Sequence, residues 1–350
     1  MGSQYSHVST RDPDDFLAGH VDGTKVVRNL GVKRRSVHSD AIGALVVIRS
    51  GLAISGSRDT TMVLHNVDNG DTIQKWYGHE GEVTKLAYGN KSAVHIVLSG
   101  SRDTTVKAWN FKSEAAQQTF EGHKLVVSGL CHLGDHQFMT GSRDCTVRIW
   151  DVNFATSLNY SQINRNLVTH MTYNPTTNLV AQSSEDKELK LWDPRSMTVS
   201  HRFPKRNHIQ LHCEWTPDGG QIITSNNGFN GDGCEISIWD LRAKKLLRDL
   251  RGHEGNVTCV SYISQTKLPN KRILLSCSSD RTARIWNIEE GNCLWVEEMG
   301  TTSDLQQCVA LGDTYAVVAG GNGLLCNMRI QYKVGKPYLQ TISVQRNEKE

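Results

Sequence analysis

The chain of 350 residues lacks the features that mark several classes of protein. Its nine cysteines stand singly, with no Cys-x-x-Cys pair, so neither a disulfide framework nor a zinc cluster is indicated. The longest strongly apolar run is short, around residues 44–48, and no apolar segment follows a basic start. The sequence therefore predicts neither a membrane span nor a signal peptide, and it predicts reduced, mostly buried thiols.

Charge and motifs exclude further classes. The net charge is only +3, and no basic run alternates with aromatic residues, so nucleic acid is not an expected partner. We find no phosphate-binding loop, no metal-binding pattern and no unique acid–base pair. The sequence thus predicts a protein that is not an enzyme and that carries no cofactor and no metal.

What the sequence does contain is a repeated phrase. It reads SGSRDTTMVLHN from Ser55, SGSRDTTVKAWN from Ser99 and TGSRDCTVRIWD from Thr140. Four weaker copies begin at Gln182, Thr224, Ser276 and Ala319. The last large residue of each copy recurs every 41–47 residues, at His65, Trp109, Trp150, Trp192, Trp239, Trp286 and Met328. This period is typical of a four-stranded propeller blade.

The pattern within one copy supports that interpretation. Val147 and Ile149 alternate with Arg148 and Trp150, as expected of a strand with apolar residues on both faces. One such unit cannot bury both faces, but seven units around an axis cover each other. The sequence therefore predicts an all-β, seven-bladed propeller over residues 38–345, and a monomer.

These residues resemble the WD40-repeat family. In that family a His, a Ser or Thr, an Asp and the Trp of each blade form a buried hydrogen-bonded tetrad. The resemblance implies three complete tetrads: His79, Ser99, Asp103 and Trp109; His123, Thr140, Asp144 and Trp150; His253, Ser276, Asp280 and Trp286. Blade one keeps His38, Ser55 and Asp59 but has His65 for the Trp. Because the set recurs around the ring, we interpret it as scaffold and not as a Ser-His-Asp catalytic site.

A narrower resemblance lies in blades four and five. The stretches NRNLVTHMTY from Asn164, SSEDKELKLWDPR from Ser183 and SNNGFNGDGCEISIWDLR from Ser225 are similar to the WD repeat-containing protein 31 family of ciliated eukaryotes. That resemblance implies a role in cilium assembly or ciliary transport and a link to small-GTPase regulators. It implies ciliary transport complexes as partners.

The first residues, MGSQYS, fit the pattern for N-myristoylation at Gly2. We expect residues 1–22 to be a flexible tail and residues 23–37 to be a basic segment. One myristoyl chain binds membranes weakly, so a second signal is needed, and Lys33, Arg34 and Arg35 could supply it. The alternative is that residues 25–32 form a strand that closes the ring against blade seven. The expected location is cytoplasmic, at a membrane and in the cilium.

Partner-binding candidates lie in turns and loops. Arg58, Arg102 and Arg143 precede the turn Asp of three successive blades, where they could form a basic arc for carboxylates or phosphates. Solvation or pairing within the chain is the alternative. Phe229, in the glycine-rich insertion at residues 228–233, is a candidate anchor.

A second class of function rests on WDPR at residues 192–195 and WDLR at residues 239–242. These motifs resemble the W-D-x-R box of substrate receptors for cullin-4 ubiquitin ligases, which makes Arg242 a candidate contact. Our main hypothesis is a non-enzymatic scaffold for protein–protein interactions, held at a membrane. The alternative is such a substrate receptor.

Overall fold

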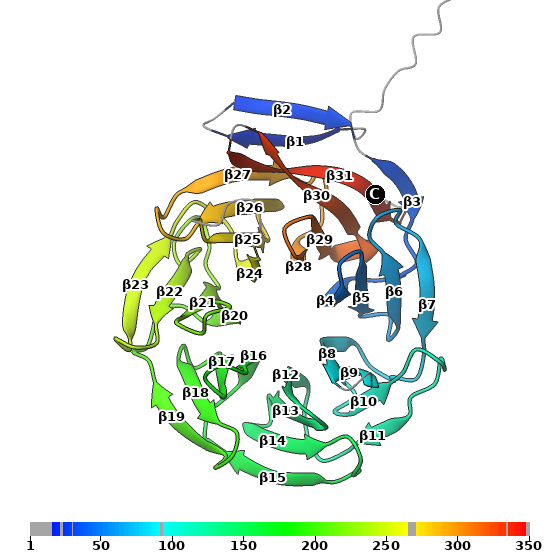
Figure 1. The fold of residues 1–350 in the computed structure, drawn as a ribbon, viewed down its shortest axis with the longest axis vertical. Helices are drawn as coiled ribbons and strands as arrows, with labels where there is room; N and C mark the ends of the chain where they lie inside the picture. The colour runs from blue at the N-terminus through cyan, green and yellow to red at the C-terminus, as the bar shows by residue number, and fades with distance from the viewer. Residues whose placement is uncertain are drawn as a thin grey trace, which may run out of the picture.

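Seven sheets surround a central axis in the computed structural model, which describes residues 16–21, 24–29, 31–91, 94–264, 271–333 and 335–347 (Figure 1). Each sheet has a core of four antiparallel strands, and the first strand of each blade lies innermost while the fourth lies at the rim. The predicted all-β, seven-bladed propeller is therefore confirmed. Within the described residues, no helix is long and apolar enough to cross a membrane.

The first four blades follow the sequence repeat directly. Their strands are β4 (Ile42–Arg49), β5 (Leu52–Ser57), β6 (Met62–Asn66) and β7 (Thr72–Trp76) in blade one, and β8 (Val83–Lys91), β9 (Val94–Ser101), β10 (Val106–Trp109) and β11 (Gln118–Phe120) in blade two. Blade three has β12 (Val127–Gly134), β13 (Gln137–Ser142), β14 (Thr146–Asp151) and β15 (Ser157–Gln162), and blade four has β16 (Val168–Asn174), β17 (Leu179–Ser184), β18 (Leu189–Asp193) and β19 (Thr198–Arg202).

The remaining blades complete the ring. Blade five has β20 (Gln210–Trp215), β21 (Gln221–Asn226), β22 (Ile236–Asp240) and β23 (Lys245–Leu250), and blade six has β24 (Val257–Ile263), β25 (Ile273–Ser278), β26 (Thr282–Asn287) and β27 (Cys293–Glu298). Blade seven has β28 (Leu305–Leu311), β29 (Tyr315–Gly320), β30 (Leu325–Lys333) and β31 (Lys336–Arg346), with a 3-10 turn η2 (Gly321–Gly323) after β29.

The core lies between the blades. Between blades one and two, for example, Met62 and Trp76 pack with Val83 and Trp109, and all four side chains are fully buried. Similar clusters fill the other junctions, which is what stacking of two-faced sheets requires. All nine cysteines are free thiols, and seven of them are buried.

The N-terminal strands do not lie where the sequence analysis placed them. Residues 16–21, expected in a flexible tail, form β1 (Phe16–Val21), which pairs with β2 (Thr24–Asn29) and with the rim strand β27 of blade six. The pairing of β1 with β2 is antiparallel and runs from Phe16 with Asn29 to Val21 with Thr24. The alternative in which residues 25–32 pair with blade seven therefore does not hold for β2, whereas Val32 does pair with Ser343 of blade seven.

Blade seven is completed by the C-terminal part of the chain. Its rim strand β31 pairs antiparallel with β30, and the short strand β3 (Val32–Arg35) then adds to β31 in parallel. Two hydrogen bonds join blade seven to blade one and to the segment before it. Ser36 Oγ donates to the Gly323 carbonyl at 2.8 Å, and Gln345 Nε2 donates to the Gly70 carbonyl at 2.9 Å. The ring is thus closed by contacts on both sides of its seam.

Candidate functional site

Three blades contain a complete chain of hydrogen bonds from the surface to the core. In blade two, His79 Nδ1 lies 2.7 Å from Asp103 Oδ2, and its Nε2 lies 2.7 Å from Ser99 Oγ. Trp109 Nε1 donates to the same Ser99 oxygen at 2.8 Å. The equivalent sets repeat this geometry in blades three and six: His123, Thr140, Asp144 and Trp150; His253, Ser276, Asp280 and Trp286.

The same geometry gives these groups a structural role. Ser99 is fully buried, and its hydroxyl is held between an imidazole and an indole, so the oxygen has no open side for a substrate. Burial alone would raise the pKa of Asp103, but hydrogen bonds from His79 and Thr105 outweigh burial and hold that pKa well below its usual range. The charged Asp103 accepts these hydrogen bonds and so holds the loop that carries His79 against the turn between β9 and β10.

Blade one forms a tetrad with a histidine in the place of the tryptophan. His38 bonds Asp59 at 3.0 Å and Ser55 Oγ at 2.8 Å, and His65 Nε2 lies 2.7 Å from the same Ser55 oxygen. His65 is buried and its Nδ1 has no hydrogen-bond partner. Burial, with a smaller contribution from His38, lowers the pKa of His65 to about 3, so this ring stays neutral at physiological pH.

Blade four replaces the tetrad by amides. Gln182 occupies the serine position, where its Oε1 accepts a hydrogen bond from Trp192 Nε1 at 2.7 Å and its Nε2 donates to Asn166 at 2.6 Å. In blade five only the link from Trp239 to Thr224 remains, at 3.0 Å, and in blade seven Met328 fills the Trp position. The sequence repeat did not predict the Asn166–Gln182 pair, because both residues differ from the repeated phrase.

The three candidate arginines lie on the face of the ring that carries the turn between the second and third strands of each blade, which we call the tetrad face. Arg58 and Arg102 both lie 3.7 Å from one carboxylate, Glu82, and Arg143 pairs with Glu185. Their side chains stay about half exposed or more, 68% in Arg102. The three arginines are therefore exposed, as a basic arc requires. Each also pairs with a glutamate of the same chain, as the alternative interpretation expects.

Other candidates fall on two faces. Phe229 lies on the tetrad face and is 77% exposed, in an insertion tied to blade six by a bond from the Gly231 amide to the Glu254 carbonyl. Arg242 is exposed in the turn after the third strand, which lies on the opposite face. Gly2 lies outside the described residues. Lys33 and Arg35 are exposed on β3 at the rim, whereas Arg34 pairs with Asp71 at 2.6 Å.

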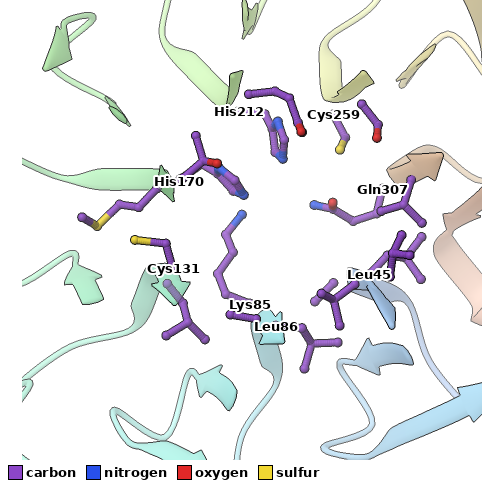
Figure 2. A pocket seen from close by; sticks show the side chains of 18 of the residues that line it. Leu45, Lys85, Leu86, Cys131, His170, His212, Cys259 and Gln307 are labelled. Atoms are coloured by element: carbon purple, nitrogen blue, oxygen red, sulfur yellow. The ribbon is translucent and has the colours of Figure 1, made fainter. Parts of the chain in front are cut away.

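The central channel contains a polar group that sequence reasoning missed. It encloses about 360 Å³ and is lined by the innermost strands of all seven blades. Figure 2 shows Lys85, His170, His212 and Gln307 pointing inward from four different blades. The rings of His170 and His212 are in contact, with their centroids 3.7 Å apart and their planes tilted by 35°. Each of these residues is the third of its innermost strand, a position outside the repeated phrase.

Enclosure shifts the ionisation of the channel groups. Burial lowers the pKa of Lys85 to about 8 and raises the pKa of Glu214 to about 8. Burial, followed by the neighbouring His212 and Lys85, lowers the pKa of His170 well below its usual range. At neutral pH Lys85 is therefore charged, whereas His170 is neutral and the Glu214 carboxyl is protonated. Within the described residues, no group of three or more side chains could hold a metal ion.

The blades and their tetrads define a repeat-built β-propeller. Four segments match the family described as "WD domain, G-beta repeat", at residues 70–110, 115–151, 160–193 and 244–287. The chain is a WD40-repeat protein. The matched segments include all three complete tetrads and the Gln182 variant.

The relatives that the chain resembles are named as a kinase-interacting protein and as nuclear distribution proteins. The chain is 26% identical to a p21-activated protein kinase-interacting protein 1-like protein from Danio rerio, over 40% of this chain and 35% of that protein. It is 26% identical to nuclear distribution protein nudF from Aspergillus niger, over 44% of this chain and 35% of that protein. It is 30% identical to nuclear distribution protein PAC1 from Arthroderma otae, over 38% of this chain and 29% of that protein. The matches span about a third of each relative, and the narrower ciliary resemblance stays a prediction.

Proposed function

We propose that the tetrad face is a docking surface for a protein partner that carries acidic and apolar side chains, and that the chain acts as a non-enzymatic scaffold. The observation that carries this proposal is the combination of Phe229, 77% exposed, and Leu125, 51% exposed, with three exposed arginines on one face. Aromatic side chains and arginines are the residues that contribute most to binding at interfaces.

The ion pairs on this face are weak enough for a partner carboxylate to replace the glutamate in them. Exposed pairs contribute little to stability, and the 3.7 Å contacts of Arg58 and Arg102 with Glu82 leave their guanidinium groups accessible. A partner carboxylate could take the place of Glu82 with bidentate geometry. The tetrads hold each arginine turn in place, so little conformational entropy is lost on binding.

The test uses tagged wild-type protein to capture partners from cells, with quantitative mass spectrometry as the readout. Reversal of Arg58, Arg102 and Arg143 to Glu, and separately Phe229→Ala, should reduce capture of the same partner by about tenfold, or about 1.4 kcal/mol. Lys112→Ala, an exposed residue in the turn after the third strand of blade two on the opposite face, is the matched control. An unchanged set of partners in both tetrad-face variants, with unchanged melting temperature, would contradict the proposal.

A second candidate function rests on the opposite face. Arg195 and Arg242 are both exposed there, in corresponding turns of the adjacent blades four and five. This placement suits contact with the adaptor of a cullin-4 ubiquitin ligase. If the same capture experiment recovers that adaptor with wild type and loses it in Arg242→Ala, the substrate-receptor function is favoured instead.

We further propose that the scaffold is membrane-tethered and works in ciliary transport or small-GTPase regulation. The Met-Gly start and the exposed Lys33 and Arg35 on the rim strand β3 support the tether, and the resemblance in blades four and five supports the ciliary role. Gly2→Ala should move the protein from the membrane fraction to the cytosol, because stable anchoring needs two signals and this change removes one of them. Unchanged fractionation would remove the tether from the proposal.

A further inference from the structure

The channel holds donors that the scaffold does not use. Lys85 on β8, His170 on β16 and Gln307 on β28 come from blades two, four and seven, and Figure 2 shows their polar ends directed at the same central space. The Lys85 ammonium makes no hydrogen bond or ion pair in the part of the chain that the structure describes, and neither does the Gln307 amide. The Lys85 side chain is only partly buried, so its ammonium is open to the channel and accessible to a ligand.

The chemistry of these three groups points to an anion. An ammonium has three N–H donors, a primary amide has two, and a neutral imidazole has one. The donors approach from different sides of a ring, so a tetrahedral oxyanion can bond all of them, whereas a planar carboxylate has only two oxygens in one plane. The channel volume of about 360 Å³ lies within the range of small-molecule sites.

We propose that the central channel binds phosphate, either as the free ion or as the phosphate group of a small organic molecule, between Lys85, His170 and Gln307. The site is separate from the tetrad face and does not depend on partner docking there. Lys85 supplies the positive charge, and the imidazole and the amide orient the phosphate oxygens.

Ionisation of the channel makes binding depend on pH. Lys85 is protonated below a pKa of about 8, and Glu214 is neutral below a pKa of about 8, so at neutral pH the ammonium is charged and the Glu214 carboxyl is not. As pH rises past 8, Lys85 loses its positive charge and Glu214 becomes negative. Both changes oppose an anion, so affinity should fall by more than tenfold between pH 7 and pH 9. The other titratable groups lining the channel are Tyr88 on β8, Cys131 and His132 on β12, His170 and Tyr173 on β16, His212 on β20, Cys259 and Tyr262 on β24, and Cys308 on β28.

The experiment is calorimetric titration of the full chain at pH 7 with inorganic phosphate and with glycerol phosphate. We expect saturable binding of one molecule per chain, and the tighter of the two probes identifies the source. Lys85→Met should weaken binding at least tenfold, whereas Lys112→Met, an exposed lysine of the same blade, should leave the affinity within twofold. Absence of saturable binding by either probe, or equal affinity of the Lys85→Met variant, would overturn the proposal.

Thermal unfolding separates a binding role from a structural one. In the described part of the chain, Lys85 makes no hydrogen bond or ion pair whose loss would lower stability. Lys85→Met without phosphate should therefore melt no lower than wild type, and phosphate should raise the melting temperature of wild type only. If Lys85→Met does not fold, Gln307→Leu serves instead, with a severalfold loss of affinity expected. Equal affinity at pH 7 and pH 9 would also overturn the proposal.

Discussion

Blade one differs from blades two, three and six at two positions of the tetrad region, Val37 and His65. In blades two, three and six a glycine precedes the tetrad histidine, and a Cβ added at Gly78 would lie 3.3 Å from Cη2 of Trp109. Gly78 also has a φ of +143°, which side chains disfavour. Blade one has Val37 at that position, and the smaller His65 replaces the indole. A larger residue at one position is thus matched by a smaller one at the other.

This pairing leads to a double-mutant prediction. His65→Trp should destabilise the protein by about 1–3 kcal/mol, because the indole must occupy space beside Val37. Val37→Gly combined with His65→Trp should recover at least about 1 kcal/mol of that loss, since it recreates the arrangement of blades two, three and six. Chemical denaturation of the wild type, both single variants and the double variant measures the coupling. Additive effects of the two changes would contradict the explanation.

The tetrads could be predicted residue by residue, while the channel could not. Ser99, Asp103 and Trp109 lie within the repeated phrase and His79 lies before it, and the resemblance to the WD40-repeat family implies the hydrogen bonds that join them. Lys85 and Gln307 lie on innermost strands, where the equivalent residues include Ala44 and Cys259. The residue type at the third position of the innermost strand varies between blades, so it does not indicate that Lys85 and Gln307 share one space. They do so only because the ring closes.

The innermost strands share an irregularity that links neighbouring blades. Their pairing with the second strand shifts just before the third residue in every blade, for example between Val127 and Gly129 in blade three. In four blades the skipped residue carries a hydroxyl that donates to the first residue of the next innermost strand. Ser128 Oγ, for instance, donates to the Val168 carbonyl at 2.5 Å, so one blade is hydrogen-bonded to the next.

Removal of one such hydroxyl should weaken a blade junction. Ser128→Ala should cost about 1 kcal/mol, because the Val168 carbonyl loses its donor while the packing is almost unchanged. Ser128→Thr keeps the hydroxyl and is the matched control. Leu211 stands at the same position in blade five, and Leu211→Thr would supply the missing donor. Equal stability of the Ala and Thr variants at position 128 in urea denaturation would contradict this role.

Closure of the ring depends on the C-terminal strand more than on the N-terminal ones. Within the described residues β31 is the fourth strand of blade seven, and its Leu339 and Val344 are buried in the cluster that joins blades six and seven. Strands β1 and β2 only extend blade six, which already has four strands. The two ends of the chain therefore contribute unequally to the fold.

Two truncations test this difference. Deletion of residues 1–31 removes β1 and β2, and the remaining chain should unfold cooperatively with a modest loss of melting temperature. Deletion of residues 335–350 removes β31, exposes the core of blade seven, and should abolish cooperative unfolding at that blade. Circular dichroism during heating measures both. A C-terminal truncation that melts at the wild-type temperature would contradict the assignment of β31 as the closing strand.

At the scale of the whole molecule, the sequence period predicts the number of blades but not the way the ends meet. A period of 41–47 residues allows only one four-stranded unit per repeat, so seven copies give seven blades. The pairing of β3, parallel to β31, depends on contacts between residues more than 300 positions apart, such as Ser36 with Arg346. No local pattern in the basic segment distinguishes pairing with blade six from pairing with blade seven.

The attachment of β1 and β2 at the rim has a mechanical consequence. Tension applied to the chain before Phe16 acts first on the hairpin and on its three residue pairs with β27, between residues 18–20 and 296–298. This outer layer can peel away while the seven four-stranded sheets stay intact. If the protein is attached through its N-terminus, a pulling force would therefore separate β1 and β2 from blade six before it reached the closing strand β31.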